Sequence, residues 1–235
     1  MNKTVSFIIP TYNERKNVPI ITKQLFDVAK KANLDLELVI VDDNSPDGTG
    51  KVVDELAKEY KIIPVHRKGK LGLGSAVTTG FRHAKGDILG VIDADLSHPP
   101  SILPRLVKPI MSGKADMVVG SRYVKGGGVE VWPWHRRLIS IVATLPARPL
   151  TRVKDPMSGL LAFRRNVIEG RKLNVKGYKI GMEILVKGNI RKVVEVPFLF
   201  RNRRVGKSKL GMSEYWDYLY NLLKLYFYVL RNGRR

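Results

Sequence analysis

Residues 88–100, ILGVIDADLSHPP, decide the fold of this chain. The apolar run at 88–92 predicts a buried strand, and Asp93 and Asp95 follow it directly. Strands that are apolar on both faces are typical of parallel sheets covered by helices on each side. In such sheets ligands bind beyond the carboxyl ends of the strands. The stretch therefore predicts a parallel sheet with a polar site at its edge.

The first half of the chain repeats the same pattern of strand followed by helix. Apolar strand-like runs alternate with segments in which apolar residues recur at helical spacing. The expected fold class is α/β, a Rossmann-like, mostly parallel sheet flanked by helices. The expected strands are residues 4–9, 36–41, 62–65, 88–92, 116–120 and 193–200, and the expected helices are 18–32, 50–59, 75–84 and 101–111.

Composition narrows the function classes. The chain has 235 residues, no cysteine and a formal net charge of +21. The missing cysteines exclude a disulfide framework, a thiolate metal site and a cysteine nucleophile. The charge favours an anionic partner, such as nucleic acid, an anionic membrane surface or a phosphorylated substrate. A nucleic-acid-binding protein is the less favoured alternative, because acidic loops would repel nucleic acid and no nucleic-acid-binding motif is present.

Two carboxylates one residue apart at a strand end suit a hard divalent cation. Asp93 and Asp95 would share a face if the strand geometry continued. Mg²⁺ and Mn²⁺ prefer oxygen ligands, and Mg²⁺ typically takes one or two carboxylates together with substrate phosphates. We therefore expect a Mg²⁺ or Mn²⁺ site here, although Asp-x-Asp alone is a weak signal.

Three motifs in one order make the signal specific. PTYNE (10–14), VDDNSPDGT (41–49) and DADLSHPP (93–100) follow successive strands, and together they resemble the family-2 glycosyltransferases with the GT-A fold. Within that family the chain is similar to the dolichol-phosphate mannose synthases. The motifs that carry this second resemblance are SRY (121–123), glycines followed by W.RR..S (134–140), D..SG (155–159) and FR.R..GKSKLG (200–211).

The resemblance implies a nucleotide-sugar pocket in the first half. Asp95 would bind the metal, and Ser97 stands where some relatives carry Gln, so a water would intervene if the hydroxyl does not ligate directly. His98 is expected to pack or cap the loop and not to take part in catalysis. The residues implied for the pocket are Pro10, Tyr12 and Glu14, Val41 and Asp43 at the guanine, and Asp93, Ala94 and Asp95 at the nucleotide sugar.

The second half carries basic groups that suit an acceptor phosphate and the donor diphosphate. Guanidinium groups bind phosphate through paired hydrogen bonds, and a hydroxyl adds a further donor. Solubilising surface charge is the alternative for any single arginine. Asp155 is expected to orient the sugar or the arginines. The residues implied as catalytic or phosphate-binding are Arg122, Arg136, Ser140, Arg203 and Lys209.

The resemblance implies transfer of mannose from GDP-mannose to dolichyl or another polyprenyl phosphate. A phosphate monoester has its second pKa near ~6, so it is mostly dianionic at neutral pH and can attack without a strong base. We expect a single displacement with inversion. The alternative within the same fold is another donor, such as UDP-glucose.

The glycine stretch GKLGLGSAVTTG (69–80) follows a strand and precedes a helix, as a dinucleotide-binding loop does. The third glycine of that motif would fall at Val77, so we expect a flexible turn beside the nucleotide, or simply a loop, instead.

The last helix is expected to lie in a membrane interface. No stretch has the 18 or so apolar residues of a spanning helix. Tyr and Trp favour the headgroup region, and basic residues add attraction to anionic lipid. The alternative is packing against the protein or a membrane-anchoring partner subunit. We expect a catalytic domain at 1–211, with halves 1–120 and 121–211, a surface helix at 212–235, and a peripheral location on the cytoplasmic face of a membrane.

Overall fold

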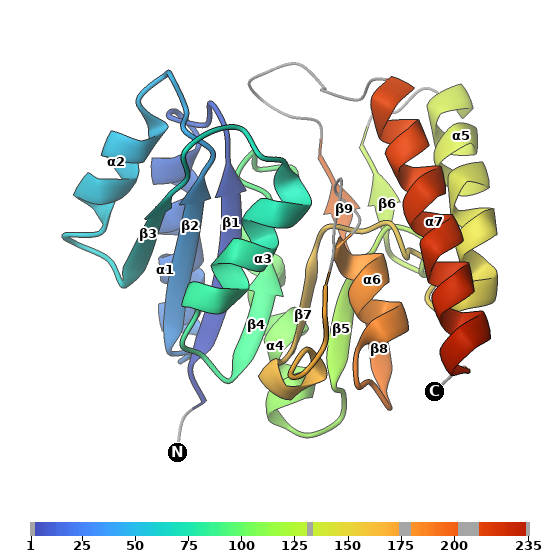
Figure 1. Cartoon of the computed structure of the whole chain (residues 1–235). Helices are drawn as coiled ribbons and strands as arrows, with labels where there is room; N and C mark the ends of the chain where they lie inside the picture. The colour runs from blue at the N-terminus through green and yellow to red at the C-terminus, as the bar shows by residue number, and fades with distance from the viewer. Residues whose placement is uncertain (1–2, 131–133, 174–179, 202–211, 234–235) are drawn as a thin grey trace.

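The computed structural model describes residues 3–130, 134–173, 180–201 and 212–233, and for 135–139 and 212–216 it describes the backbone alone. One seven-stranded sheet in the order β3-β2-β1-β4-β7-β5-β8 forms the centre of the molecule (Figure 1). Every pairing in it is parallel except those of β7 with β4 and β5. The strands are β1 (Val5–Thr11), β2 (Leu36–Asp42), β3 (Ile62–His66), β4 (Ile88–Val91), β5 (Met117–Ser121), β7 (Leu161–Arg164) and β8 (Val193–Pro197).

Helices cover both faces of the sheet. On one face Phe7 and Ile9 of β1 pack in a core with helices α1 (Val18–Lys31), α2 (Thr49–Leu56) and α4 (Leu103–Met111). On the other face Ile8 and Val41 pack with α3 (Leu73–His83) and α6 (Ile180–Lys187). Alternate strand residues therefore enter separate cores, as the pleat of a strand requires. Short 3₁₀ turns lie at Pro100–Ile102, Leu145–Leu150 and Arg165–Val167.

The predicted α/β fold is confirmed, with two differences in the second half. The expected strand at 193–200 is two strands, because β8 ends at Pro197 and β9 (Leu199–Phe200) pairs with β6 (Gly128–Val129) in a separate sheet. The antiparallel strand β7 was not predicted. It has only four residues and lies between β4 and β5. Its extended conformation therefore depends on pairing with both neighbouring strands, which the local sequence pattern does not reveal.

Helix α5 (Trp134–Thr144) and helix α7 (Met212–Asn232) lie beside each other at the side of the molecule away from α2 (Figure 1). Tyr218 and Leu222 of α7 are buried against Ala147. The Tyr218 hydroxyl donates to the Ala143 carbonyl at 2.7 Å, and burial raises the pKa of Tyr218 to about 12. Within the described residues, no helix combines the length and apolar character needed to cross a bilayer.

The strand register aligns the loops that follow β1, β2 and β4. Ile8 of β1 lies opposite Val39 of β2 and Val91 of β4. Past this point the Asp43 N–H still donates to the Thr11 carbonyl at 3.0 Å. The three acidic loops therefore leave the sheet side by side at its carboxyl edge, as predicted.

Helix α3 approaches the sheet closely at Gly80. A Cβ at this position would lie 2.5 Å from Ile8 Cγ2 and 3.2 Å from Val41 Cγ2. Overpacking of this kind costs about 1–3 kcal/mol. We expect Gly80→Ala to lower the midpoint of urea unfolding accordingly. Gly69→Ala is the control, since nothing lies within 4 Å of its Cβ position, and equal midpoints for the two variants would contradict the close packing of α3.

Candidate active site

The loops after β1 and β2 are joined by hydrogen bonds from the backbone of one to side chains of the other. Three consecutive N–H groups of the first loop donate to oxygens of the second, at 2.9, 3.0 and 3.2 Å. The two acidic motifs are thus joined to each other and are not two separate turns. The pairs are Asn13 with Ser45 Oγ, Glu14 with Thr49 Oγ1, and Arg15 with Asp47 Oδ2.

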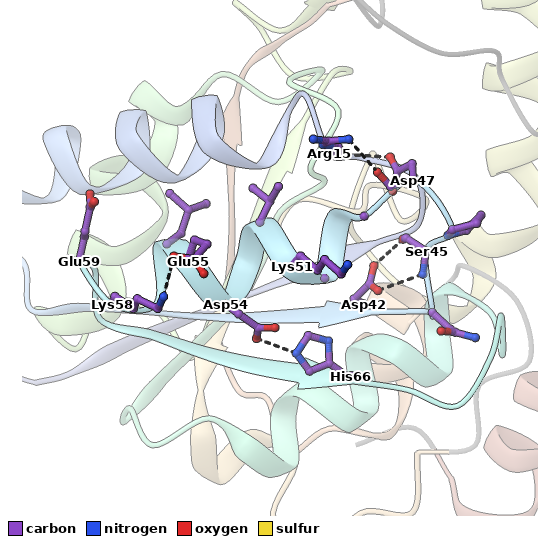
Figure 2. Close-up of a pocket in the computed structure, with 16 residues that line it drawn as sticks. Arg15, Asp42, Ser45, Asp47, Lys51, Asp54, Glu55, Lys58, Glu59 and His66 are labelled. Carbon is purple, nitrogen blue, oxygen red and sulfur yellow. Dashed lines mark hydrogen bonds and ion pairs between the residues drawn. The ribbon is translucent and has the colours of Figure 1, made fainter.

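The adjacent carboxylates Asp42, at the end of β2, and Asp43, just past it, accept hydrogen bonds from different partners. Asp42 accepts hydrogen bonds from Thr11 Oγ1 and from the backbone and hydroxyl of Ser45. It lines an open groove of about 930 Å³ beside α2, where His66 pairs with Asp54 at 2.8 Å (Figure 2). The residues predicted for the nucleotide-sugar pocket do not line this groove. It is therefore distinct from the predicted site.

Asp43 anchors the glycine stretch. Its Oδ1 accepts Arg67 Nη1 at 2.7 Å, and its Oδ2 accepts the N–H groups of Leu71 and Gly72, each at 3.1 Å. Burial raises the pKa of the Asp43 carboxyl, because Arg67 and the two N–H groups offset it only in part. Residues 67–72 therefore form a loop that Asp43 holds beside the end of β2. A loop was predicted at this place, but these hydrogen bonds do not fit the flexible turn that was expected there. Arg67 itself was not singled out from the sequence.

The other residues predicted for the nucleotide-sugar pocket lie at this same edge. Tyr12 is half-buried, and the Lys70 ammonium lies 4.7 Å from the centre of its ring. Glu14 is half-buried and accepts the Asn17 amide at 2.7 Å. The buried members of the set are Pro10, Val41 and Ala94.

The third loop is a tight turn and not a continuation of the strand. Strand β4 ends at Val91, and Leu96 has a φ of 62°. A left-handed conformation at a leucine costs on the order of 1–3 kcal/mol, so surrounding contacts must hold it. The turn separates the two carboxylates. The Asp93 side chain is 30% exposed and Asp95 is 3% exposed. A shared face was expected only if the strand geometry continued, and β4 ends before both residues.

The residues of this turn fit a hard divalent cation. The Ser97 N–H donates to Asp95 Oδ1 at 3.0 Å, and the buried Ser97 Oγ has no hydrogen-bond partner in the described part of the chain. An unsatisfied buried hydroxyl costs about 1–3 kcal/mol, which an oxygen-seeking ligand would relieve. No three His, Cys, Asp or Glu side chains of the described residues group as metal ligands. Asp95 and Ser97 could supply only part of a coordination shell, and substrate phosphates commonly supply the remaining oxygens at Mg²⁺ sites.

His98 packs the loop from behind, as predicted. It is 2% exposed, and its ring meets those of Phe198 and Phe200 edge-on at 5.4 and 5.9 Å. The Asp93 N–H donates to His98 Nδ1 at 3.3 Å. His98 is thus a packing residue that ties the acidic turn to the β8–β9 segment.

In the second half of the chain, Arg122 is held by Asp155. Arg122 Nε and Nη2 donate to the two carboxylate oxygens, each at 2.8 Å, and the Arg122 N–H adds a bond of 3.0 Å. Asp155 is fully buried, and Glu195 accepts its N–H at 3.2 Å. Burial acts to lower the pKa of Arg122, but Asp155 outweighs it and raises that pKa above its ordinary value. Asp155 therefore orients Arg122, the second of the two roles expected for it.

The segment 155–159 links this pair to the acidic turn. It begins at Asp155, and a Cβ at Gly159 would lie 3.7 Å from Asp93 Oδ2. The Tyr123 hydroxyl lies 2.7 Å from Ser140 Oγ of α5, one helical turn after Arg136. Asp93, Arg122 and Ser140 are thus parts of one connected region, as the sequence predicts. The Arg136 side chain, Arg203 and Lys209 lie outside what the structure describes.

Comparison with known proteins agrees with this geometry. The family model described as glycosyl transferase family 2 matches residues 6–171, which include the three acidic loops and the Arg122–Asp155 pair. The chain belongs to glycosyl transferase family 2.

Several curated members of the family have similar sequences. Dolichol-phosphate mannosyltransferase of Pyrococcus furiosus is 48% identical over 227 residues, which span 94% of this chain and 63% of that protein. The protein of the same name from Saccharomyces cerevisiae is 39% identical, over 97% of this chain and 89% of its own length. The predicted similarity to the dolichol-phosphate mannose synthases is confirmed. The chain spans just under two thirds of the archaeal relative.

Solved structures confirm the GT-A fold. Glucosyl-3-phosphoglycerate synthase from Mycobacterium tuberculosis, in complex with Mn²⁺, UDP and glucosyl-3-phosphoglycerate, has a TM-score of 0.65 at 21% identity. The match covers 99% of this chain and 81% of the mycobacterial one. At this identity the likeness concerns the fold alone.

The Arg122–Asp155 pair of this glycosyltransferase should couple energetically. Breaking a buried ion pair at one partner leaves an uncompensated charge and costs about 3–5 kcal/mol. We expect Arg122→Ala and Asp155→Ala each to destabilise the protein by that amount, and the double variant to cost clearly less than their sum. Urea unfolding of the four proteins in a double-mutant cycle measures this coupling. Additive losses would contradict the pairing.

Proposed function

We propose that this glycosyltransferase moves mannose from GDP-mannose to dolichyl or another polyprenyl phosphate, giving the lipid phosphate mannose and GDP. The observation that carries the proposal is the single connected region that holds Asp93, Asp95 and the Arg122–Asp155 pair at one sheet edge. The names of the curated relatives support the mannosyl donor and the dolichyl phosphate acceptor.

The donor side is the surface formed by the loops after β1, β2 and β4. In parallel sheets, ligands bind beyond the carboxyl ends of the strands at the point where the strand order reverses. Here that point is β1, which lies between β2 and β4. In this proposal Pro10, Tyr12, Val41 and Asp43 line the base pocket, with Asp93 and Ala94 at the sugar. Residues 1–120 then form the nucleotide-sugar half of a catalytic domain that ends near residue 211.

Asp95 and Ser97 are the residues that would hold Mg²⁺ or Mn²⁺. Their buried oxygens and the lack of a partner for Ser97 Oγ support this assignment. A bound divalent cation would offset the negative charge of a diphosphate leaving group.

The acceptor side is centred on Arg122. A guanidinium held rigidly by a carboxylate is pre-organised, and pre-organised charges stabilise anions without reorganisation. The Ser140 hydroxyl contacts the hydroxyl of Tyr123, the residue that follows Arg122, and Arg136 lies on the same helix as Ser140. We place the acceptor phosphate here and assign Arg203 and Lys209 to the same anionic groups.

The chemistry is a single displacement at the anomeric carbon. An oxygen of the acceptor phosphate forms the new bond to this carbon as the bond to the diphosphate oxygen breaks, with inversion. The phosphate is already largely ionised at neutral pH, so no side chain has to remove a proton. The protein supplies orientation and positive charge. The same arrangement would serve UDP-glucose, the second candidate donor.

The membrane side is the exposed face of α7 and α5. Leu219, Leu223, Phe227 and Leu230 recur at helical spacing and are 44–80% exposed. Lys224 and Arg231 are exposed on the same helix, which suits anionic lipid. We propose that α7 lies in the cytoplasmic interface of a membrane, with or without an anchoring partner subunit. Its opposite face packs on the protein through Tyr218, Leu222 and Leu225.

Sugar transfer tests the enzymatic proposal. We expect the purified protein with Mg²⁺ or Mn²⁺ to transfer labelled mannose from GDP-mannose to a polyprenyl phosphate, and Asp95→Ala to lower the rate by about 10³-fold or more. Asp27→Ala, at an exposed aspartate of α1, is the control. Transfer from UDP-glucose alone would select the second donor. No transfer from either donor would overturn the proposal.

Vesicle flotation tests the membrane proposal. We expect the protein to float with vesicles of anionic phospholipid and Leu223→Glu/Phe227→Glu to reduce the bound fraction by about tenfold or more, because two exposed apolar side chains are lost from the interface. Ile20→Glu, at an exposed isoleucine of α1, is the control. Equal flotation of the two variants would contradict the assigned face.

A further inference from the structure

Tyr123 contacts two of the residues that the proposed function places at the acceptor phosphate. Its ring lies against the guanidinium of Arg122, whose Cζ is 5.2 Å from the ring centre. Its hydroxyl lies 2.7 Å from Ser140 Oγ. Arg122 follows the end of β5, whereas Ser140 lies on α5. The side chain of Tyr123 therefore joins a guanidinium at the sheet edge to a hydroxyl on a neighbouring helix.

Both ends of this connection are anchored. At the sheet edge, Arg122 is held by its hydrogen bonds to the buried carboxylate of Asp155. Helix α5 lies beside α7 (Figure 1), and the Tyr218 hydroxyl of α7 donates to the Ala143 carbonyl of α5 at 2.7 Å. The contact between Tyr123 and α5 thus spans two fixed elements, and it holds the Ser140 hydroxyl in place relative to the guanidinium.

The direction of the hydrogen bond between Tyr123 and Ser140 follows from the ligand that Ser140 is proposed to bind. Each hydroxyl has one O–H to donate, and the geometry alone permits either of them to be the donor. The terminal oxygens of an ionised phosphate are hydrogen-bond acceptors. Ser140 must therefore keep its O–H for the phosphate, which leaves Tyr123 as the donor to Ser140 Oγ.

The result is a chain of two hydrogen bonds, from Tyr123 to Ser140 and from Ser140 to the phosphate. In such a chain each bond polarises the next and strengthens it, and hydroxyl donors to anions form short, strong bonds. Among the described residues, Tyr123 is the one hydrogen-bond partner of the Ser140 hydroxyl. The orientation of the serine O–H therefore depends on Tyr123.

We infer that Tyr123 is a positioning residue for the acceptor phosphate, and that it acts through Ser140 by directing the serine O–H toward that phosphate. Arg122 and Ser140 then hold the phosphate from two sides. A phosphate monoester has three terminal oxygens, so one remains free to form the new bond. The inference rests on the proposed function in one respect, namely that a phosphate monoester is held at Arg122 and Ser140.

The inference predicts a change in acceptor binding and not in the chemical step. As the new bond forms, negative charge moves from the acceptor phosphate to the diphosphate leaving group. A hydrogen bond to the acceptor phosphate therefore does not strengthen in the transition state, and its loss raises KM without lowering kcat. A purely structural contact would instead reduce the active fraction of the protein, which lowers the apparent kcat and leaves both KM values unchanged.

Steady-state sugar transfer by the full chain tests the inference. Tyr123→Phe removes the hydroxyl and keeps the ring, and it should raise KM for a polyprenyl phosphate about three- to tenfold, the usual effect of losing one hydrogen bond. Both kcat and KM for the sugar nucleotide should stay within about twofold. Tyr60→Phe is the matched control, because Tyr60 packs on Phe26 next to β3, at the opposite edge of the sheet. It should leave all these constants unchanged.

A double variant tests whether Tyr123 acts through Ser140. Ser140→Ala should raise the acceptor KM at least as much as Tyr123→Phe, and the combined variant should raise it no further than Ser140→Ala alone. Ser140→Thr keeps the hydroxyl and should retain a KM close to the natural value. Effects that multiply in the combined variant, or a lower kcat with both KM values unchanged, would overturn the inference.

Thermal unfolding shows whether each variant is folded. If Tyr123→Phe is not, the comparison of Ser140→Ala with Ser140→Thr tests the same hydrogen bond from its other partner.

Titration with geranyl phosphate, a soluble prenyl phosphate monoester, gives a measurement that requires no sugar transfer. We expect Tyr123→Phe to raise the Kd of geranyl phosphate about three- to tenfold and to leave the Kd of GDP unchanged. A higher Kd for GDP together with an unchanged Kd for geranyl phosphate would place the pair on the donor side and contradict the inference.

The two proposals fail separately. If Tyr123→Phe weakens the binding of geranyl phosphate and no mannose or glucose is transferred by the natural protein, the proposed reaction is wrong and the phosphate-positioning role stands. If transfer occurs and folded Tyr123→Phe keeps the natural acceptor KM and Kd, the reaction stands and Tyr123 only packs between β5 and α5.

Discussion

The site depends on the position of β1 between two parallel neighbours. With Ile8 opposite both Val39 and Val91, the three strands end at one level, and the side chains beyond them share an edge. A shift of one residue in either pairing would turn every pocket residue of that strand to the other face. The separate cores above and below the sheet, built from alternating residues of β1, resist such a shift.

Buried charge is organised in the same way on both sides of the sheet edge. Asp43 holds Arg67 and two backbone N–H groups, and Asp155 holds Arg122 and one. In each case a nearly buried carboxylate fixes a guanidinium and a loop at once. Ion pairs of this kind add little to stability in themselves, but each removes a strong penalty that either partner alone would bring. This explains how a chain with a large excess of cations can keep selected ones immobile.

Much of the donor side could be predicted from the sequence, because strands, acidic loops and their order are local patterns. PTYNE, VDDNSPDG and DADLSHPP each follow an apolar run that reads as a strand. What could not be predicted depends on distant partners. Arg67 is one of many basic residues until Asp43 is seen beside it, 24 positions earlier. Glu195 lies 40 residues from the N–H it accepts, and the turn at Leu96 carries no glycine to signal it.

The reversed strand has a consequence for how the chain folds. Among the described residues, strand β5 pairs with β7 and β8 alone, and β7 also pairs with β4. Until residues 161–164 have been synthesised, β5 has no neighbour in the sheet and β4 has one open edge, and the other edge of β5 stays open until residues 193–197 follow. Residues 1–120 are thus complete in sequence before the sheet that they belong to is complete. Its unpaired edges are exposed to other chains in that interval, and a chaperone or rapid docking of the later strands would have to protect them.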